Sequence, residues 1–236
     1  MDSSIILQQN QLYFNYQTPN EITRNFIRNM YFYLFKRTLF IHGFMYIPYF
    51  NYGELFFNSL CSGGLFVIFT YMLLISTALL YSNFNNYNES DMISYSYMLT
   101  ICFSYILTYF TNYFDTQFYI LNIHYLTILF ASIFTYTNQI KYPYKYDNII
   151  KISFSSQFIL FVILTILYSN FEYILFTYLT SSLTTLYIIY NTENIITNEL
   201  RIFPIKTDEY LSGSILLYLD IFNIFPHFKK TFTELI

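Results

Sequence analysis

Apolar residues gather in long stretches along this chain. Five stretches contain no Lys, Arg, Asp or Glu, and they lie at residues 60–82, 92–112, 117–136, 152–170 and 173–190. A helix that crosses a lipid bilayer needs about 20 consecutive, mostly apolar residues. Each of the five stretches therefore predicts a membrane-spanning helix.

Two further segments give a weaker apolar signal. Residues 31–52 include Lys36 and Arg37, whose long side chains can extend to the lipid headgroups, so we expect this segment to be the first span. Residues 211–225 are shorter and contain Asp220, so we expect a helix that is re-entrant or enclosed by protein. The pattern predicts an all-α polytopic membrane protein, with six transmembrane helices around a short seventh.

The basic residues predict how the spans are oriented. They lie before or at the first span, between the fourth and fifth, after the sixth and at the end of the chain: Arg24, Arg28, Lys36, Arg37, Lys141, Lys145, Lys151, Arg201, Lys206, Lys229 and Lys230. Because cytosolic loops carry the excess of Lys and Arg, both termini are expected to be cytosolic. We expect one membrane domain over residues 24–230, a polar tail over 1–23 and a short tail over 231–236.

Composition supports a membrane protein and excludes several other classes. Hydrophobic residues make up 55% of the 236 residues and charged residues 11%, whereas soluble domains carry about 25% charged residues. The lipid bilayer is thus the expected partner. The net charge of −3 offers no basic surface for nucleic acid. Cys61 and Cys102 both lie in apolar stretches, which indicates neither a disulfide framework nor a zinc site.

The sequence shows no catalytic set. His42, His124 and His227 lie in different segments, and no serine motif, paired carboxylate or metal-ligand spacing accompanies them. We interpret these histidines as packing or interface residues, and we expect neither enzyme activity nor a resident cofactor or metal. The Gly63–Gly64 pair is interpreted as a point where helices approach each other closely.

Asp220 is the one acidic residue inside an apolar segment. A carboxylate within the membrane is costly, so its presence indicates a functional role. The alternative is a neutral carboxyl group that is hydrogen-bonded to a neighbouring helix.

Four blocks of sequence resemble the transmembrane Bax-inhibitor-motif (TMBIM) family, in the order of that family. The most specific is DEYLSGSILLYLDIFNIF at 208–225, which resembles EYV-x-A-x-x-LYLDIINLF. LYIIYNTENII at 186–196 is similar to the LYIIYDTQ-x-I of the sixth helix. TYTNQIKYPY at 135–144 and RNFIRNMY at 24–31 resemble the link after the fourth helix and the entry into the first.

This resemblance implies a seven-helix bundle and a cation leak, mainly of Ca²⁺, from an intracellular store, with a role in resisting cell death. The endoplasmic reticulum or the Golgi is the membrane it implies. It also implies that an aspartate of the sixth helix and one of the seventh share protons and control opening. Asp220 matches the second, whereas Asn191 stands where the first is expected.

The Asn191 substitution changes the expected chemistry of this pair. Two adjacent carboxylates cannot both ionise cheaply, whereas an amide can donate a hydrogen bond to a carboxylate. Asn223 could add an oxygen ligand for a passing cation. Glu193 is a candidate substitute acid, but two positions further along a helix it points about 200° away. Phe103 replaces a glutamate that is common in the family, so the polar set is reduced.

Two functions remain open on the sequence. In the first, Ca²⁺ passes through the bundle, and Asp220 with Asn191 forms the gate. In the alternative, the chain is a non-conducting protein of the same fold that binds other membrane proteins.

Overall fold

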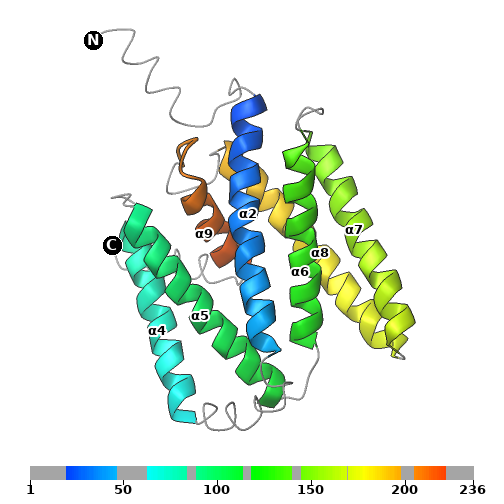
Figure 1. Cartoon of the computed structure of the whole chain (residues 1–236), viewed down its shortest axis with the longest axis horizontal. Coiled ribbons are helices and arrows are strands. Elements are labelled where there is room, and N and C mark those ends of the chain that lie inside the picture. The colour runs from blue at the N-terminus through cyan, green and yellow to red at the C-terminus, as the bar shows by residue number, and fades with distance from the viewer. Residues whose placement is uncertain are drawn as a thin grey trace, which may run out of the picture. The chain divides into compact units, whose positions relative to one another are not determined.

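The computed structural model describes residues 20–46, 63–83, 89–113, 118–139, 145–168, 170–197 and 205–221 (Figure 1). Within these residues the regular structure is helical and includes no strand. The helices are α2 (Asn20–Met45), α4 (Gly63–Asn83), α5 (Glu89–Tyr113), α6 (Phe118–Asn138), α7 (Tyr146–Leu167), α8 (Phe171–Thr197) and α9 (Tyr210–Ile221). The predicted all-α class is confirmed.

Four of the helices are long and apolar enough to cross a membrane. Their candidate spans are Glu89–Thr111, Tyr119–Asn138, Tyr146–Leu167 and Phe171–Thr197. The apolar parts of α4 and α9 are shorter, at Gly64–Leu80 and Tyr210–Leu219. Helix α2, which carries Arg24, Arg28, Lys36 and Arg37, is not among the four. The structure thus supports a protein with several membrane-crossing helices, and the six-span arrangement stays a prediction.

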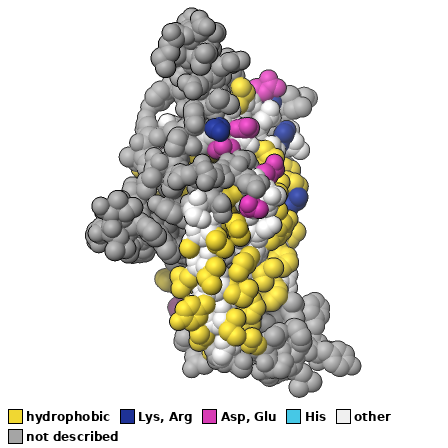
Figure 2. Space-filling model, turned by 90° about the vertical axis from the view of Figure 1, so that its left-hand side faces the viewer, with side chains coloured by type: hydrophobic (Ala, Val, Ile, Leu, Met, Phe, Trp, Pro, Cys, Tyr) yellow, Lys and Arg dark blue, Asp and Glu magenta, His cyan; other side chains and the backbone are white. Residues whose placement is uncertain are grey.

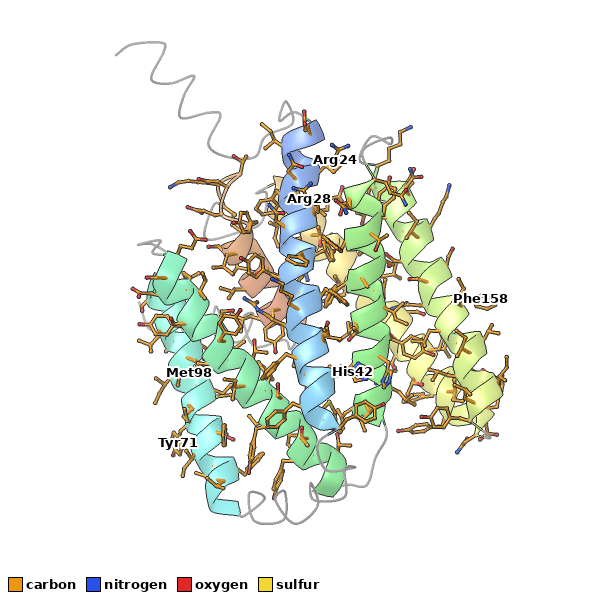
Figure 3. All side chains as sticks on the ribbon, viewed as in Figure 1. Arg24, Arg28, His42, Tyr71, Met98 and Phe158 are labelled. Atoms are coloured by element: carbon orange, nitrogen blue, oxygen red, sulfur yellow. The ribbon has the colours of Figure 1, made fainter. Side chains whose placement is uncertain are left out.

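Helices α7 and α8 expose apolar side chains and bury polar ones. On α7, Phe158 points away from the protein (Figure 3), and Ile166 is 79% exposed, whereas Gln157 is fully buried. The other exposed apolar residues of the two helices are Ile159, Val162, Ile163, Leu167, Phe171, Phe176, Leu179, Leu183, Leu186, Tyr187 and Tyr190. Water would penalise this distribution, while lipid favours it, because the hydrocarbon interior satisfies no polar group. The outer faces of α7 and α8 are therefore suited to contact lipid.

Helix α4 presents an apolar face of the same kind. Its exposed residues recur at the helical spacing of three and four positions: Val67, Ile68, Tyr71, Leu74 and Ile75. Figure 2 shows the side of the molecule on which α4 lies, where hydrophobic side chains gather on the lower part of the face. This stripe is likewise suited to lipid.

The chain divides into two compact units. Unit one comprises residues 1–34 and 128–236, and unit two comprises residues 35–127. Helix α2 and helix α6 each contribute one part to each unit. In unit one, α7 packs against α8 and α8 against α9, and in unit two α4 packs along α5 (Figure 1).

Helix α9 is buried over nearly its whole length in unit one. All residues from Leu211 to Leu219 are buried, including the polar Ser212 and Ser214. A Cβ added at Gly213 would lie 2.8 Å from Phe26 Cζ of α2 and 3.3 Å from Met30 Sδ. Glycine therefore permits the close approach of α9 to α2. At Gly64, where the sequence led us to expect a close approach, an added Cβ would meet nothing within 4 Å, so that expectation was wrong.

Aromatic stacking joins α4 to α5 in unit two. The rings of Phe69 and Tyr105 stack with centroids 4.1 Å apart, and those of Phe66 and Tyr109 stack at 4.5 Å. Offset stacks of this kind contribute about 0.5–1.5 kcal/mol each beyond the area they bury.

The position of Arg37 in unit two corrects an expectation from the sequence. We expected Lys36 and Arg37 to extend toward lipid headgroups. Lys36 is exposed, but Arg37 is only 6% exposed, and its Nη2 donates a hydrogen bond to Ser96 Oγ of α5. The guanidinium is held inside the protein because α5 provides a hydroxyl acceptor at that point.

Candidate functional site

Polar side chains line the buried side of α8. We call the set the α8 polar stripe, and its members are Thr177, Ser181, Thr185, Asn191 and Thr192. Three of these hydroxyls lie at four-residue intervals, which places them on one face of a helix. Several donate to a backbone carbonyl one turn earlier, for example Thr185 Oγ1 to Ser181 O at 2.9 Å. Such bonds satisfy the hydroxyl protons without an outside partner and leave oxygen lone pairs facing inward.

Gln157 of α7 connects with the middle of the stripe. Its Nε2 donates to Thr185 Oγ1 at 2.6 Å and lies 3.4 Å from Ser181 Oγ. Gln157 Oε1 and the nearby Ser153 Oγ are buried and have no hydrogen-bond partner among the described residues. Two buried oxygen atoms are thus left on the face of α7 that carries the contact with α8.

Tyr31 of α2 contacts the far end of the stripe. Its hydroxyl lies 2.7 Å from Thr192 Oγ1, while Thr192 Oγ1 also lies 2.8 Å from Ile188 O. Because a carbonyl can only accept, Thr192 donates to Ile188 and Tyr31 donates to Thr192. This contact joins α2 to α8 inside unit one.

Asn191 lies in the same buried region as Thr192. It is 8% exposed, and its Nδ2 has no hydrogen-bond acceptor among the described residues. A buried amide donor without an acceptor costs about 1–3 kcal/mol. Asn191 therefore requires an acceptor that the described residues do not supply.

Two other predicted site residues, Asp220 and Asn223, lie wholly or partly outside the residues that the structure describes. The backbone of Asp220 belongs to the last turn of α9, but its side chain lies outside the described residues, as does all of Asn223. The distance between Asn191 and Asp220 is accordingly still a prediction.

Glu193 lies on the other side of α8 from Asn191. Its side chain is exposed and lies near that of Tyr146 at the start of α7. The separation of about 200° between these two positions of a helix accounts for the difference in burial. Glu193 is therefore not part of the α8 polar stripe.

Helix α5 in unit two has a row of buried hydroxyls that the sequence analysis missed. Ser96, Thr100, Ser104 and Thr108 are all buried and spaced by four residues. The last three each donate to the carbonyl of the residue four positions before. The four-residue spacing of Ser and Thr in an apolar segment is the signal that could have revealed this row. Phe103, at the position of the family glutamate, is buried on the same helix.

The structure also brings together two histidines that we interpreted only as packing or interface residues of different segments. His42 of α2 and His124 of α6 have ring centroids 4.0 Å apart, within unit two. No sequence signal joins them, because 81 residues separate them along the chain and neither lies in a metal-ligand motif. His227 lies outside the described residues.

The described residues contain no group of three or more His, Cys, Asp or Glu side chains that could hold a metal ion. Cys102 is a free cysteine and is buried in α5. No protein-family model, curated protein or solved structure matches the chain.

Proposed function

We propose that the chain is a membrane-embedded cation leak that conducts Ca²⁺, with the α8 polar stripe as part of its pathway. The observation that carries the proposal is the stripe itself: a helix apolar enough to span a membrane buries five hydroxyl and amide side chains along one side and exposes apolar side chains on the other. Polar groups that face the interior of a membrane bundle are the groups from which ion pathways are built.

The chemistry of the stripe suits weak and transient contact with a hard cation. Ca²⁺ binds through oxygen ligands, and a conducting site must release the ion as readily as it accepts it. The stripe supplies neutral hydroxyl oxygens, and Gln157 Oε1 and Ser153 Oγ face it from α7 without partners among the described residues. The neutral oxygens of the stripe bind a cation only weakly, as a leak requires.

The proposed gate is the pair of Asn191 and Asp220. Asn191 has a buried Nδ2 that needs an acceptor, and the Asp220 carboxylate, in the last turn of α9, is the acceptor that we propose. Helix α9 packs against α8, which supports this assignment. Asn223, just beyond α9, is proposed to add an oxygen near the gate. Glu193 is left out of the pathway because its side chain is exposed.

The family assignment and the cellular setting belong to the same proposal. We place the chain as a divergent member of the Bax-inhibitor-motif family, with six spans around α9 and both termini cytosolic. The endoplasmic reticulum or the Golgi membrane is its proposed location, and modulation of calcium levels and cell death its proposed role. Imaging of a tagged chain, with protease protection of an N-terminal and a C-terminal tag, tests location and orientation.

The alternative is a non-conducting protein of the same fold that binds other membrane proteins. Hydrogen bonds from neighbouring helices to the stripe favour it. Gln157 joins α7 to α8, and Tyr31 joins α2 to α8. Hydrogen bonds between helices also serve simply to hold a membrane bundle together.

Calcium entry into liposomes separates the two functions. We expect the purified chain to admit Ca²⁺ into dye-loaded liposomes faster than protein-free liposomes do. Replacing the buried Asn191 by Leu should change the rate, whereas the same replacement at Asn138, an exposed residue at the end of α6, should not. A rate for the parent no higher than that of protein-free liposomes would favour the interaction protein.

A further inference from the structure

Three polar rings from two helices meet at one end of α2. His42 lies in the last turn of α2, Tyr46 comes directly after the end of that helix, and His124 comes from α6. The ring centroids of His42 and His124 are 4.0 Å apart, those of His42 and Tyr46 5.2 Å, and those of Tyr46 and His124 6.0 Å. We call these three residues the His–Tyr cluster. All three belong to unit two.

Hydrogen bonds fix the orientation and the tautomer of His124. Its Nδ1 lies 2.6 Å from Ile120 O, and its Nε2 lies 3.1 Å from the Tyr46 hydroxyl. The carbonyl oxygen can only accept, so Nδ1 carries the proton and Nε2 of the neutral ring has a lone pair that faces Tyr46. In metal-binding histidines one ring nitrogen commonly donates to a backbone carbonyl while the other coordinates the ion. Here Nε2 accepts the Tyr46 hydroxyl proton, so a bound ion would take the place of that proton, which is released to solvent.

The surroundings of the cluster leave it accessible. His42, Tyr46 and His124 are each partly exposed rather than buried. Figure 3 shows the His42 side chain near the lower end of α2, on the side toward α6. The three rings are thus not sealed inside the core of unit two.

We propose that the His–Tyr cluster binds a transition-metal ion such as Zn²⁺ or Cu²⁺. Imidazole nitrogen suits Zn and Cu, whereas Ca²⁺ prefers oxygen ligands, so the site is distinct in chemistry from the proposed calcium pathway. The ligands are His124 Nε2, an imidazole nitrogen of His42 and, once deprotonated, the Tyr46 phenolate. Two imidazoles and a phenolate bound to one ion would tie the end of α2 to α6.

Binding of the metal alone to the purified full-length chain tests the proposal. After treatment with a chelator, the chain in detergent is titrated with Zn²⁺ and with Cu²⁺ by calorimetry, and we expect one site. His42→Gln and His124→Gln should each raise the dissociation constant by about tenfold or more, since loss of even an outer-sphere partner costs about 10–100-fold. The matched control is His227→Gln, which removes the third histidine of the chain and should leave this site unchanged.

Two spectroscopic readouts keep the test decisive if a variant fails to fold. Cu²⁺ bound to the parent should show hyperfine coupling to imidazole nitrogens and a phenolate-to-copper charge-transfer band, and Tyr46→Phe should remove only the band. Zn²⁺ should also raise the thermal unfolding temperature of the parent, since it binds the folded state. Absence of binding to the parent, or binding that only His227→Gln weakens, would overturn the proposal. Neither result bears on calcium conduction, because the two sites use different ions.

Discussion

The amide of Gln157 lies 2.6 Å from the hydroxyl of Thr185, and this hydrogen bond joins α7 to α8 in a region where both side chains are fully buried. In lipid neither group has water as an alternative partner, so the contact both holds the two helices together and fixes where polar atoms meet. The hydrogen bond between Gln157 and Thr185 thus belongs both to the packing of unit one and to the proposed ion pathway.

Replacing Gln157 by Leu is expected to lower the stability of the folded chain. The change keeps the approximate volume but removes the donor to Thr185, and hydrogen bonds between membrane helices contribute about 0.6 kcal/mol on average and up to about 1.7 kcal/mol. Thermal unfolding in detergent measures the effect. Gln139→Leu, at an exposed position beyond the end of α6, is the control and should leave the unfolding temperature unchanged. Equal unfolding temperatures for the two variants would mean that the α7–α8 hydrogen bond contributes nothing to stability.

Gly213→Ala should destabilise the chain by about 1–3 kcal/mol. The new methyl group would lie 2.8 Å from Phe26 Cζ, so either the Phe26 ring or α9 has to move. Gly43→Ala is the matched control, since a Cβ there meets nothing within 4 Å. Unfolding by heat or denaturant should give Gly213→Ala a clearly lower free energy of unfolding than Gly43→Ala. A Gly213→Ala variant as stable as the parent would show that α9 does not approach α2 this closely.

The lipid-facing side of α7 can be tested with tryptophan, because the chain has none of its own. Ile163 of α7 is 47% exposed, so brominated lipids should strongly quench the tryptophan fluorescence of an Ile163→Trp variant in reconstituted vesicles. Phe130→Trp, at a fully buried position of α6, should be quenched weakly under the same conditions. Similar quenching at both positions would contradict the assignment of the exposed apolar face to lipid.

The sequence predicted the helices well because apolar length alone determines them. Each stretch that we expected to be helical overlaps a helix, but the bounds differ. The first predicted span at 31–52 overlaps α2, which begins at Asn20 and ends at Met45, α7 begins at Tyr146 rather than at 152, and α8 extends beyond 190 to Thr197. Polar residues such as Lys151 and Glu193 hid these extensions from a search for apolar residues. Amphipathic helix ends in the polar headgroup region carry such residues without losing their backbone hydrogen bonds.

Contacts between helices were not predictable from the sequence in the same way. Gly213, rather than Gly64, is the position of close approach, because this depends on what α2 presents opposite the glycine. Arg37 is buried because α5 places Ser96 beside it. His42 meets His124 because the last turn of α2 lies beside the first turns of α6, which is distant in sequence. Asn191 could be singled out only through its place in the YNT motif, and its burial emerged from the structure.

The proposed gate predicts a particular dependence of flux on pH. With Asn191 opposite Asp220 the gate has one titrating carboxyl group, so opening should follow a single-site curve. Asn191→Asp introduces a second carboxylate, and because two adjacent carboxylates cannot both ionise cheaply, the pair should titrate in two coupled steps. Asp220→Asn leaves no titrating group in the pair. Asn138→Asp, which adds a carboxylate at an exposed position, controls for the added charge.

Calcium flux into dye-loaded liposomes, measured from about pH 5 to about pH 8 for the parent and these three variants, tests the central claim most directly. We predict that Asn191→Asp makes flux depend more strongly on pH than in the parent, that Asp220→Asn removes the dependence, and that Asn138→Asp follows the parent. Identical pH profiles for the parent, Asn191→Asp and Asp220→Asn, or no flux above protein-free liposomes at any pH, would contradict the account.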